Sequence, residues 1–332
     1  MNVRRCKIEG TGKYLPQKII SSTAMDELLK VPKGWSEEKS GVKERYFVED
    51  ETASYMAAKA ICEALINAGL EHSDLDCIIG TSGTMEQPIP CNAALIQKQL
   101  GLGNSGIACF DINSTCLSFL VGLDMASYLI DTGRYKKVAL VSSDVPSVGL
   151  NWGQNESSVL FGDGAGAVIV GSGKDSNTGK IIACKLETYS DGAHLSEVRG
   201  GGSRYHPREY SKQTKDEFLF DMNGRAIFKL TSELMEGFVA RLLEPCNLTI
   251  SNMKMVIPHQ ASQGAMRLIR KRLGVEQDKF MSIVENHGNV VAASLPMALH
   301  EAIKQQRITR GDKVMLLGTS AGLSLGGLIL EY

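Results

Sequence analysis

Three short polar segments, far apart in the chain, carry residue types that enzymes use for covalent chemistry. They span residues 113–119 (NSTCLSF), 257–262 (IPHQAS) and 286–289 (NHGN). Cys116 begins a long apolar pattern of helical period, and the positive end of a helix dipole favours a thiolate at such a position. A thiolate is a nucleophile that forms covalent intermediates. The sequence therefore predicts an enzyme whose nucleophile is Cys116.

The other two segments supply side chains that would assist this nucleophile. His259 offers Cys116 a route to the thiolate, and the backbone N–H groups of Cys116 and of the turn 318–322 (GTSAG) would form an oxyanion hole. His259 and Asn289 donate hydrogen bonds from neutral side chains, which suits stabilisation of an enolate. We therefore expect the three segments to meet at one site.

Each assisting residue also has a competing interpretation. His287 competes with His259 as the active imidazole, and a histidine after an apolar strand also fits a structural role. Asn289 also fits a turn residue of left-handed conformation. Glu86 is a candidate base that also fits a solvated loop. The run 161–167 (FGDGAGA) contains Gly-x-Gly but precedes a strand, which disfavours a phosphate-binding role.

Length and composition narrow the class of protein. The chain of 332 residues has 36 Lys and Arg against 37 Asp and Glu, a net charge of −1, so its overall charge favours neither nucleic acid nor an anionic membrane as a partner. No apolar run reaches about eighteen residues, and the N-terminus lacks an apolar signal region. We expect a cytoplasmic protein.

The cysteines do not form a recognisable metal or disulfide pattern. They show no CxxC pair and no regular spacing, so we expect no zinc site and no disulfide framework. Most of them fit small buried hydrophobes, and Cys116 differs by its neighbours. The eight positions are 6, 62, 77, 91, 109, 116, 184 and 246.

Short apolar runs alternate with helical patterns along the chain. This alternation predicts an α/β architecture with largely parallel sheets. The predicted strands are 77–79, 138–142, 167–170, 255–257, 314–317 and 328–330, and the predicted helices are 54–68, 92–100, 116–132, 225–243, 262–273 and 292–305.

A weak internal repeat indicates two duplicated halves. Residues 70–79 resemble residues 248–257, an offset of 248 − 70 = 178, and residues 137–141 resemble residues 313–317, an offset of 313 − 137 = 176. The join would fall within 171–178. The prediction is an N-terminal half, residues 1–174, that carries the nucleophilic Cys, and a C-terminal half, residues 175–332, that carries His259 and Asn289. The nucleophile segment would lie opposite the Asn289 segment, near the ends of strands where α/β proteins bind ligands.

Together and in this order, these segments resemble the thiolase-fold condensing enzymes, and most closely the β-ketoacyl-acyl-carrier-protein synthase III family. The resemblance runs over nearly the whole chain, and the shared order and spacing of its strings make it specific. Those strings are 10–16 (GTGKYLP), 41–45 (GVKER), 161–167, 258–261 (PHQA), 287–289 (HGN) and the C-terminal glycine-rich strand.

The resemblance implies a five-layered αβαβα fold of two halves, a homodimer, and a Cys-His-Asn triad of Cys116, His259 and Asn289. It also implies that the Cys accepts an acyl group from a thioester, usually of coenzyme A. His and Asn then assist decarboxylation of malonyl carried on acyl carrier protein, and the carbanion attacks the acyl-enzyme. The reaction uses these two substrates and needs no metal or other cofactor. The oxyanion hole would use the backbone N–H groups of Cys116 and Ala321.

Several positions depart from the family pattern around the expected substrate site. Trp35 matches a tryptophan that stacks on the adenine of coenzyme A, and Lys39 stands near a position that is often Arg. Asn155 and Gly264 occupy positions where well-known members carry Arg for phosphates or carrier docking, and neither supplies a guanidinium. The basic run that would serve the acidic carrier protein instead, or form a solvated helix face, is Arg267, Arg270, Lys271 and Arg272.

The expected acyl cavity also differs from the family pattern. Thr319 stands where many members have Phe, and Ala321 replaces a glycine. Ile89 falls in the loop that reaches the partner's acyl tunnel in family dimers, and Leu117 is larger than the usual residue. These changes indicate an acyl pocket that differs from that of the acetyl-specific enzyme, and a role in secondary metabolism stays open as an alternative to fatty acid synthesis. Ala261 and Ser262 complete the expected substrate-binding set.

Other functions stay open on the same fold. A non-decarboxylative head-to-head condensation, or an ester- or amide-forming acyl transfer, is compatible with Thr319 and the missing arginines. A reaction like that of HMG-coenzyme-A synthase would need Glu86 as its base. A non-catalytic partner subunit is the alternative of another class, and the presence of all three triad residues disfavours it.

Overall fold

The structure, a computed structural model, describes residues 3–173 and 179–332. Within these residues the strands are β1 Arg4–Tyr14, β2 Lys18–Ser21, β3 Glu44–Phe47, β4 Cys77–Gly80, β5 Ala108–Asp111, β6 Lys137–Asp144, β7 Gly164–Ser172, β8 Lys180–Thr188, β9 Ser196–Glu197, β10 Asp221–Met222, β11 Met255–Pro258, β12 Lys313–Ser320 and β13 Ser324–Glu331. The α-helices of the same residues are α1 Ser22–Leu29, α2 Trp35–Ser40, α3 Ala53–Ala68, α4 Asn92–Gln99, α5 Ser118–Asp131, α6 Asn155–Ser158, α7 Gly224–Leu243, α8 Gln263–Arg272 and α9 Ser294–Lys304.

The main sheet is mixed, and the prediction of largely parallel sheets was wrong. In the described residues its nine strands run in the order β11-β12-β13-β8-β1-β7-β6-β4-β5. Three neighbouring pairs are parallel, β11–β12, β4–β6 and β4–β5, and the other five pairs are antiparallel. The reason is local. A tight turn joins β12 to β13, and the helix α6 between β6 and β7 has only four residues, which is too short to cross the sheet, so both pairs are antiparallel.

The strands alternate between two buried faces, and this alternation builds the layers. In the first half of the sheet, Ile79 and Leu140 enter a central core with α5 and α9, whereas Ile78 and Val141 pack on the other face under α3 and α4. Successive side chains of a strand point to opposite faces, so each apolar strand is covered on both sides.

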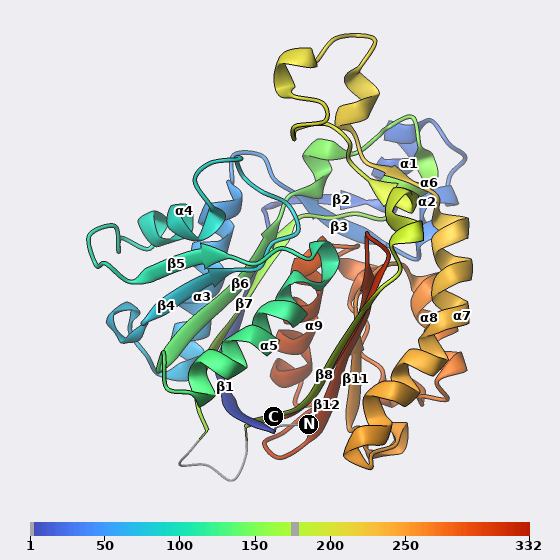
Figure 1. The fold of residues 1–332 in the computed structure, drawn as a ribbon. Coiled ribbons are helices and arrows are strands. Elements are labelled where there is room, and N and C mark those ends of the chain that lie inside the picture. Colours follow the sequence, from blue (N-terminus) through green and yellow to red (C-terminus); the bar gives the residue numbers. More distant parts are fainter. Residues whose placement is uncertain (1–2, 174–178) are drawn as a thin grey trace.

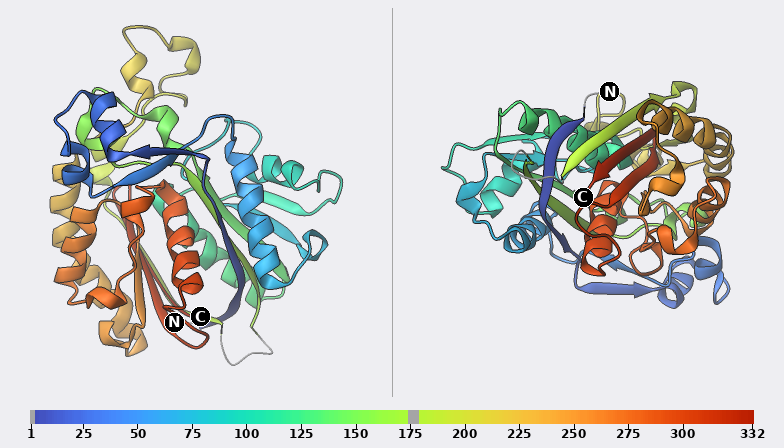
Figure 2. Two further views of the ribbon diagram at one scale, coloured as in Figure 1. Left: turned by 180° about the vertical axis from the view of Figure 1, so that it is seen from behind. Right: turned by 90° about the horizontal axis from the view of Figure 1, so that it is seen from below.

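The second half of the sheet repeats this arrangement. Leu316 and Leu328 join the central core, whereas Met315 and Ile329 pack outward under α7 and α8. The result is a five-layered αβαβα fold in which α5 and α9 form the middle layer (Figure 1 and Figure 2). The predicted fold class is therefore confirmed. The segment carrying the short 3₁₀ turns Pro207–Glu209 and Lys215–Phe218 projects from this body at the top of Figure 1.

Both halves of the sheet have the same strand order outward from the centre. It reads β1-β7-β6-β4 on one side and β8-β13-β12-β11 on the other, and the first side adds β5 at its edge. The strands β1 and β8 pair only at Arg4 and Arg5. The expected join at 174/175 lies outside the described residues, so the boundaries of the two halves stay a prediction.

The six predicted helices are all present, with ends shifted by at most two residues. Two of them begin with a 3₁₀ turn, Thr115–Leu117 (η2) before α5 and Val291–Ala293 (η11) before α9. No helix within the described ranges is both long enough and apolar enough to span a bilayer.

Candidate active site

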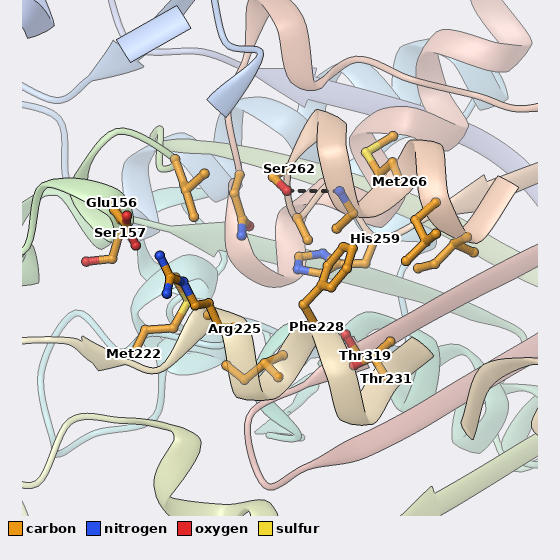
Figure 3. Close-up of a pocket in the computed structure, with 18 of the residues that line it drawn as sticks. Glu156, Ser157, Met222, Arg225, Phe228, Thr231, His259, Ser262, Met266 and Thr319 are labelled. Atoms are coloured by element: carbon orange, nitrogen blue, oxygen red, sulfur yellow. Dashed lines mark hydrogen bonds between the residues drawn. The ribbon is translucent and has the colours of Figure 1, made fainter. Parts of the chain in front are cut away.

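A cavity of about 750 Å³ opens between α7, α8 and the end of β12 (Figure 3). Side chains from both of these helices and from the loops after β11 and before η11 line it, so residues far apart in sequence meet there. Its walls include Lys39, Asn155, Glu156, Arg225, Phe228, Thr231, His259, Ala261, Ser262, Met266, Asn289, Gly318 and Thr319.

Cys116 lies in η2, directly before α5, and not in the helix itself. Its predecessor Thr115 has φ of 47°, a left-handed backbone that turns the chain sharply between β5 and α5. Ser118 accepts a hydrogen bond from the backbone N–H of Ser114 at 2.8 Å and closes the turn. The Cys116 side chain packs with Phe161 and Val291 in a small apolar cluster.

Two backbone N–H groups near the Cys116 sulfur lower the pKa of the thiol. They belong to Cys116 and Ala321. The Thr115 hydroxyl also lies 3.4 Å from the carbonyl oxygen of Ala321, which ties η2 to the glycine-rich turn. An acyl oxygen on the sulfur would lie close to the same two donors, as an oxyanion hole requires.

Burial of Cys116 opposes the thiolate that its position before a helix was expected to favour. Burial raises the pKa of Cys116 to about 12, and the negative charge of Asp144 acts in the same direction. The two backbone donors lower the pKa by less than burial raises it. The helix dipole acts only on the first turn, whereas the loss of water acts on the whole side chain.

His259 follows β11 and faces the cavity as a neutral imidazole. Its backbone N–H donates to the carbonyl of Leu317 at 2.7 Å, which fixes it beside β12. Burial lowers the pKa of His259 to about 4, and within the described residues its Nδ1 has no hydrogen-bond partner. At neutral pH the ring can therefore accept a proton or donate a hydrogen bond.

Asn289 lies in the same cavity wall as His259. Its backbone bridges to the 160–162 segment: the N–H donates to Leu160 O at 2.8 Å, and its carbonyl accepts from Gly162 at 3.1 Å. Its Oδ1 accepts from the N–H of Val291 at 3.0 Å. The side-chain amide nitrogen is thereby left to donate to a reacting group.

His287, the competing histidine, and Glu86, the candidate base, lie outside the cavity lining. His287 has Nδ1 3.0 Å from the carbonyl of Ile283 and Nε2 3.1 Å from Nζ of Lys13, so both of its nitrogens are engaged away from the cavity walls. The Glu86 carboxylate accepts from the backbone N–H of Ser54 at 2.7 Å and lies outside the cavity lining. The geometry favours His259 as the active imidazole.

The expected substrate-binding residues divide into two groups. Lys39, Ala261, Ser262 and Thr319 line the cavity. Three others do not. Trp35 packs in a cluster under α1, Ile89 is 83% exposed in its loop, and Leu117 is fully buried in the central core. Cys116 itself is not among the lining side chains and lies next to the cavity, in the cluster with Phe161.

Leu117 is outside the cavity lining because its side chain faces the sheet. A Cβ built on Gly318 or Gly326 would lie 3.2 Å or 3.0 Å from a Leu117 methyl group, so Leu117 fills space that these glycines leave open in β12 and β13. Residues that follow each other in a 3₁₀ turn point in different directions, so adjacency to the nucleophile did not place Leu117 in the cavity.

Sequence reasoning missed Asp144, at the end of β6. Its Oδ1 accepts from the backbone N–H groups of Gly83 and Thr84 at 2.8 Å and 2.7 Å, and its Oδ2 accepts from Ala293 at 3.0 Å. Burial raises the pKa of Asp144 to about 6 despite these donors. The sequence shows only an aspartate at the end of an apolar strand, which marks a titratable group but not its partners.

Comparisons with known proteins agree with the fold. The family model described as 3-oxoacyl-[acyl-carrier-protein (ACP)] synthase III matches residues 110–190, and the model of its C-terminal part matches residues 243–332. The beta-ketoacyl-[acyl-carrier-protein] synthase III of Aquifex aeolicus is 33% identical over 98% of this chain and 99% of its own. That of Clostridium perfringens is 32% identical over 99% and 100%.

Solved structures of the same family have a similar fold. The crystal structure of the Aquifex aeolicus enzyme superposes with a TM-score of 0.89 at 32% identity, covering 98% of this chain and 100% of the other. A Pseudomonas aeruginosa enzyme of the same type gives 0.88 at 27% identity, with coverage of 99% and 98%. The chain belongs to the β-ketoacyl-[acyl-carrier-protein] synthase III family and is an acyltransferase of that type.

Proposed function

We propose that this acyltransferase loads an acyl group from a thioester onto Cys116 and condenses it with malonyl-acyl carrier protein. The observation that carries the proposal is the meeting of three elements: the N–H of Ala321 at the Cys116 sulfur, and His259 and Asn289 in one adjoining wall. A thiol, an oxyanion site and two neutral hydrogen-bond donors are the parts that such a reaction needs.

In the first step Cys116 attacks the carbonyl carbon of the thioester. Its proton passes to His259, which is neutral at pH 7 because burial keeps its pKa near 4. The developing oxyanion accepts from the N–H groups of Cys116 and Ala321. When the intermediate collapses, the carbon–sulfur bond of the donor breaks, and the leaving thiolate takes the proton from His259.

In the second step the malonyl group loses carbon dioxide, and the electron pair of the broken bond forms an enolate. His259 and the Asn289 amide nitrogen donate to the enolate oxygen. Its carbon then attacks the acyl group, the acyl–sulfur bond breaks, and the Cys116 thiolate takes a proton from solvent. No charged base is required, which fits a site built from neutral donors.

The partners follow from the same proposal. The chain would act as a homodimer in which Ile89, exposed in its loop, reaches the partner's site. The acidic carrier protein would dock on α8, where Arg267 and Lys271 lie exposed one turn apart. Arg270 and Arg272 contribute less, since they donate to the carbonyls of Val275 and Ser232.

The two duplicated halves, residues 1–174 and 175–332, and the cytoplasmic location belong to the proposal as well. The matching strand order outward from β1 and from β8 supports the halves.

Mass spectrometry of the loaded protein tests the first step. Incubation with a panel of acyl-coenzyme A and acyl-carrier-protein donors should add the mass of one acyl group to the peptide that contains Cys116, and Cys116→Ala should show no adduct. Release of carbon dioxide from malonyl-acyl carrier protein by the loaded protein tests the second. If no donor loads Cys116, the proposal fails; if loading occurs without carbon dioxide release, only the condensation is refuted.

One observation favours a second candidate, a transfer of the acyl group to a polar acceptor without decarboxylation. Thr319 and Thr231 both line the cavity beside Phe228 (Figure 3), and Thr319 is partly exposed. A second substrate that keeps a polar group would hydrogen-bond to the Thr319 hydroxyl. Consumption of the acyl-enzyme by a non-malonyl acceptor would identify this reaction.

A further inference from the structure

A cation that the sequence did not single out lies in the cavity wall. Arg225 projects from the first turn of α7 on the side of the cavity where Glu156 and Ser157 lie, whereas His259 lies beside Phe228 (Figure 3). The expected phosphate-binding arginines are missing from this wall, since position 155 is Asn and position 264 is Gly. We propose that Arg225 binds a phosphate group of the pantetheine-borne acyl donor.

Arg225 is available to an anion. It is exposed, and among residues 3–173 and 179–332 no carboxylate lies within salt-bridge distance of it. The other lining cation, Lys39, lies 3.8 Å from Glu38. The charged side chains that line the cavity are Lys39, Arg225 and Glu156, so two cations face one carboxylate.

In the free protein, the charge of Arg225 interacts unfavourably with the dipole of α7. A cation in the first turn of a helix faces the positive end of its dipole, and the first turn of α7 contains no acidic residue to offset it. Asn223 caps this turn through a hydrogen bond from the N–H of Ala226 at 3.1 Å. A bound anion would interact favourably with both the guanidinium and the helix end.

The chemistry of the donor supplies such an anion. The inference rests on the proposed function, in which the donor is a thioester of coenzyme A or of the carrier protein, and both carry a phosphate on the pantetheine arm. The reacting sulfur must reach Cys116 past His259 and Asn289, while Arg225 lies in the wall of the same cavity and offers two parallel N–H donors to phosphate oxygens.

Three ligands separate the phosphate contact from the rest of the arm. Isothermal titration of the full chain, under reducing conditions, compares coenzyme A, 4′-phosphopantetheine and pantetheine, which lacks phosphate. Arg225→Ala should weaken binding of the phosphorylated ligands roughly tenfold or more and leave pantetheine unchanged. The effect should shrink as salt is raised.

Lys229→Ala is the matched control. Lys229 lies one turn farther along α7, carries the same charge, is exposed, and does not line the cavity, so its loss should change all three affinities little. Equal weakening by both variants would show a general field effect and overturn the inference. No change in Arg225→Ala, or the same change for pantetheine, would overturn it as well.

The two phosphorylated ligands locate the contact. Weakening of both assigns Arg225 to the 4′-phosphate that carrier and coenzyme share, and weakening of coenzyme A alone assigns it to the nucleotide phosphates. Binding requires no catalysis, so the two proposals fail separately. If Cys116 loads normally from acyl-coenzyme A while Arg225→Ala binds it unchanged, the function stands and the inference falls.

Discussion

Two turns of this molecule have nearly the same backbone and different chemistry. The turn η2, which contains Cys116, and the turn η11, which contains Ala292, are 291 − 115 = 176 residues apart at their first residues, the same offset as one of the sequence repeats. Thr115 and Val291 have φ values of 47° and 46°. Each turn leads directly into one of the two central helices, α5 and α9.

The hydrogen bonds that hold the two turns are also equivalent. Asn113 Oδ1 accepts from the N–H of Thr115 at 2.8 Å, and Asn289 Oδ1 accepts from Val291 at 3.0 Å. At the start of each following helix a serine hydroxyl accepts a hydrogen bond from the backbone N–H of the residue before the turn. Ser118 accepts from Ser114, and Ser294 accepts from Val290. A left-handed residue in such a turn is therefore a property of the fold and needs no catalytic explanation.

The difference between the turns lies in their surroundings. Cys116 has the N–H of Ala321 at its sulfur, whereas Ala292 is fully buried and its neighbour Ala293 donates to Asp144. In the second turn it is the capping residue, Asn289, that reaches the cavity. The fold thus supplies one scaffold twice, and each copy presents a different residue to the site.

The largest effect is expected from removing the two equivalent asparagines in turn. Asn289→Ala and Asn113→Ala each remove one side-chain cap, so each should lower the free energy of unfolding by about 1 kcal/mol. Only Asn289→Ala also removes a donor from the cavity, and it should slow condensation roughly 10²- to 10³-fold while loading of Cys116 continues.

Single-turnover mass spectrometry measures loading and condensation separately in both variants. Similar loss of condensation in Asn113→Ala would mean that the cap, through the shape of the turn, accounts for the effect. Asn289→Asp adds a check, because it keeps the oxygen that caps Val291 and replaces the donating amide. It should retain stability at neutral pH and lose condensation.

Elements could be predicted from the sequence where their buried residues are apolar and regularly spaced. Elements and residues whose role depends on distant parts of the chain were missed. Helices such as α3 and α7 were visible because one face of each is apolar at helical spacing. The strands β1 and β8 were missed because charged and apolar residues mix along them. Asp144 could not be predicted as a link, because its donors come from residues 83, 84 and 293.

The same limit applies to the site. The types of Cys116, His259 and Asn289 were enough to expect one site, because a thiol nucleophile needs hydrogen-bond donors beside it and each residue follows a separate predicted strand. The effects that raise the pKa of Cys116 could not be predicted, because the dipole is inferred from local sequence, whereas burial and the charge of Asp144 come from the folded chain.

A smaller effect is expected from Asp144→Asn, which weakens the link between the two turns. The asparagine amide keeps one acceptor oxygen, but its NH₂ group replaces the other and faces a backbone N–H that it cannot bind. The free energy of unfolding should therefore fall by about 1–3 kcal/mol. Loss of the negative charge should lower the pKa of Cys116, because Asp144 raises it. Alkylation of Cys116, followed by peptide mass spectrometry between pH 7 and 10, should then be faster in the variant at each pH.

The pH dependence of stability supplies an independent check on Asp144. Its folded pKa of about 6 lies above the ordinary value of 3.8, so the native state binds the proton more tightly than the unfolded chain. The stability that this provides is full below about pH 3.8 and is lost as the pH rises through 6. Denaturant titrations should show that, from about pH 3.8 to above pH 6, the free energy of unfolding of the parent falls relative to that of Asp144→Asn. A constant difference would contradict the raised pKa.

The smallest effect is expected from moving the thiol to the second turn, in the double variant Cys116→Ala with Ala292→Cys. Both turns have the same backbone, so if turn geometry alone made the nucleophile, loading would return. We expect no acyl adduct, because position 292 is fully buried and lacks the Ala321 donor. Adding sulfur there should cost about 1–3 kcal/mol of stability, measured by denaturant titration, with Cys116→Ala alone as the control. An adduct at position 292 would show instead that the turn confers reactivity, and that the Ala321 donor is dispensable.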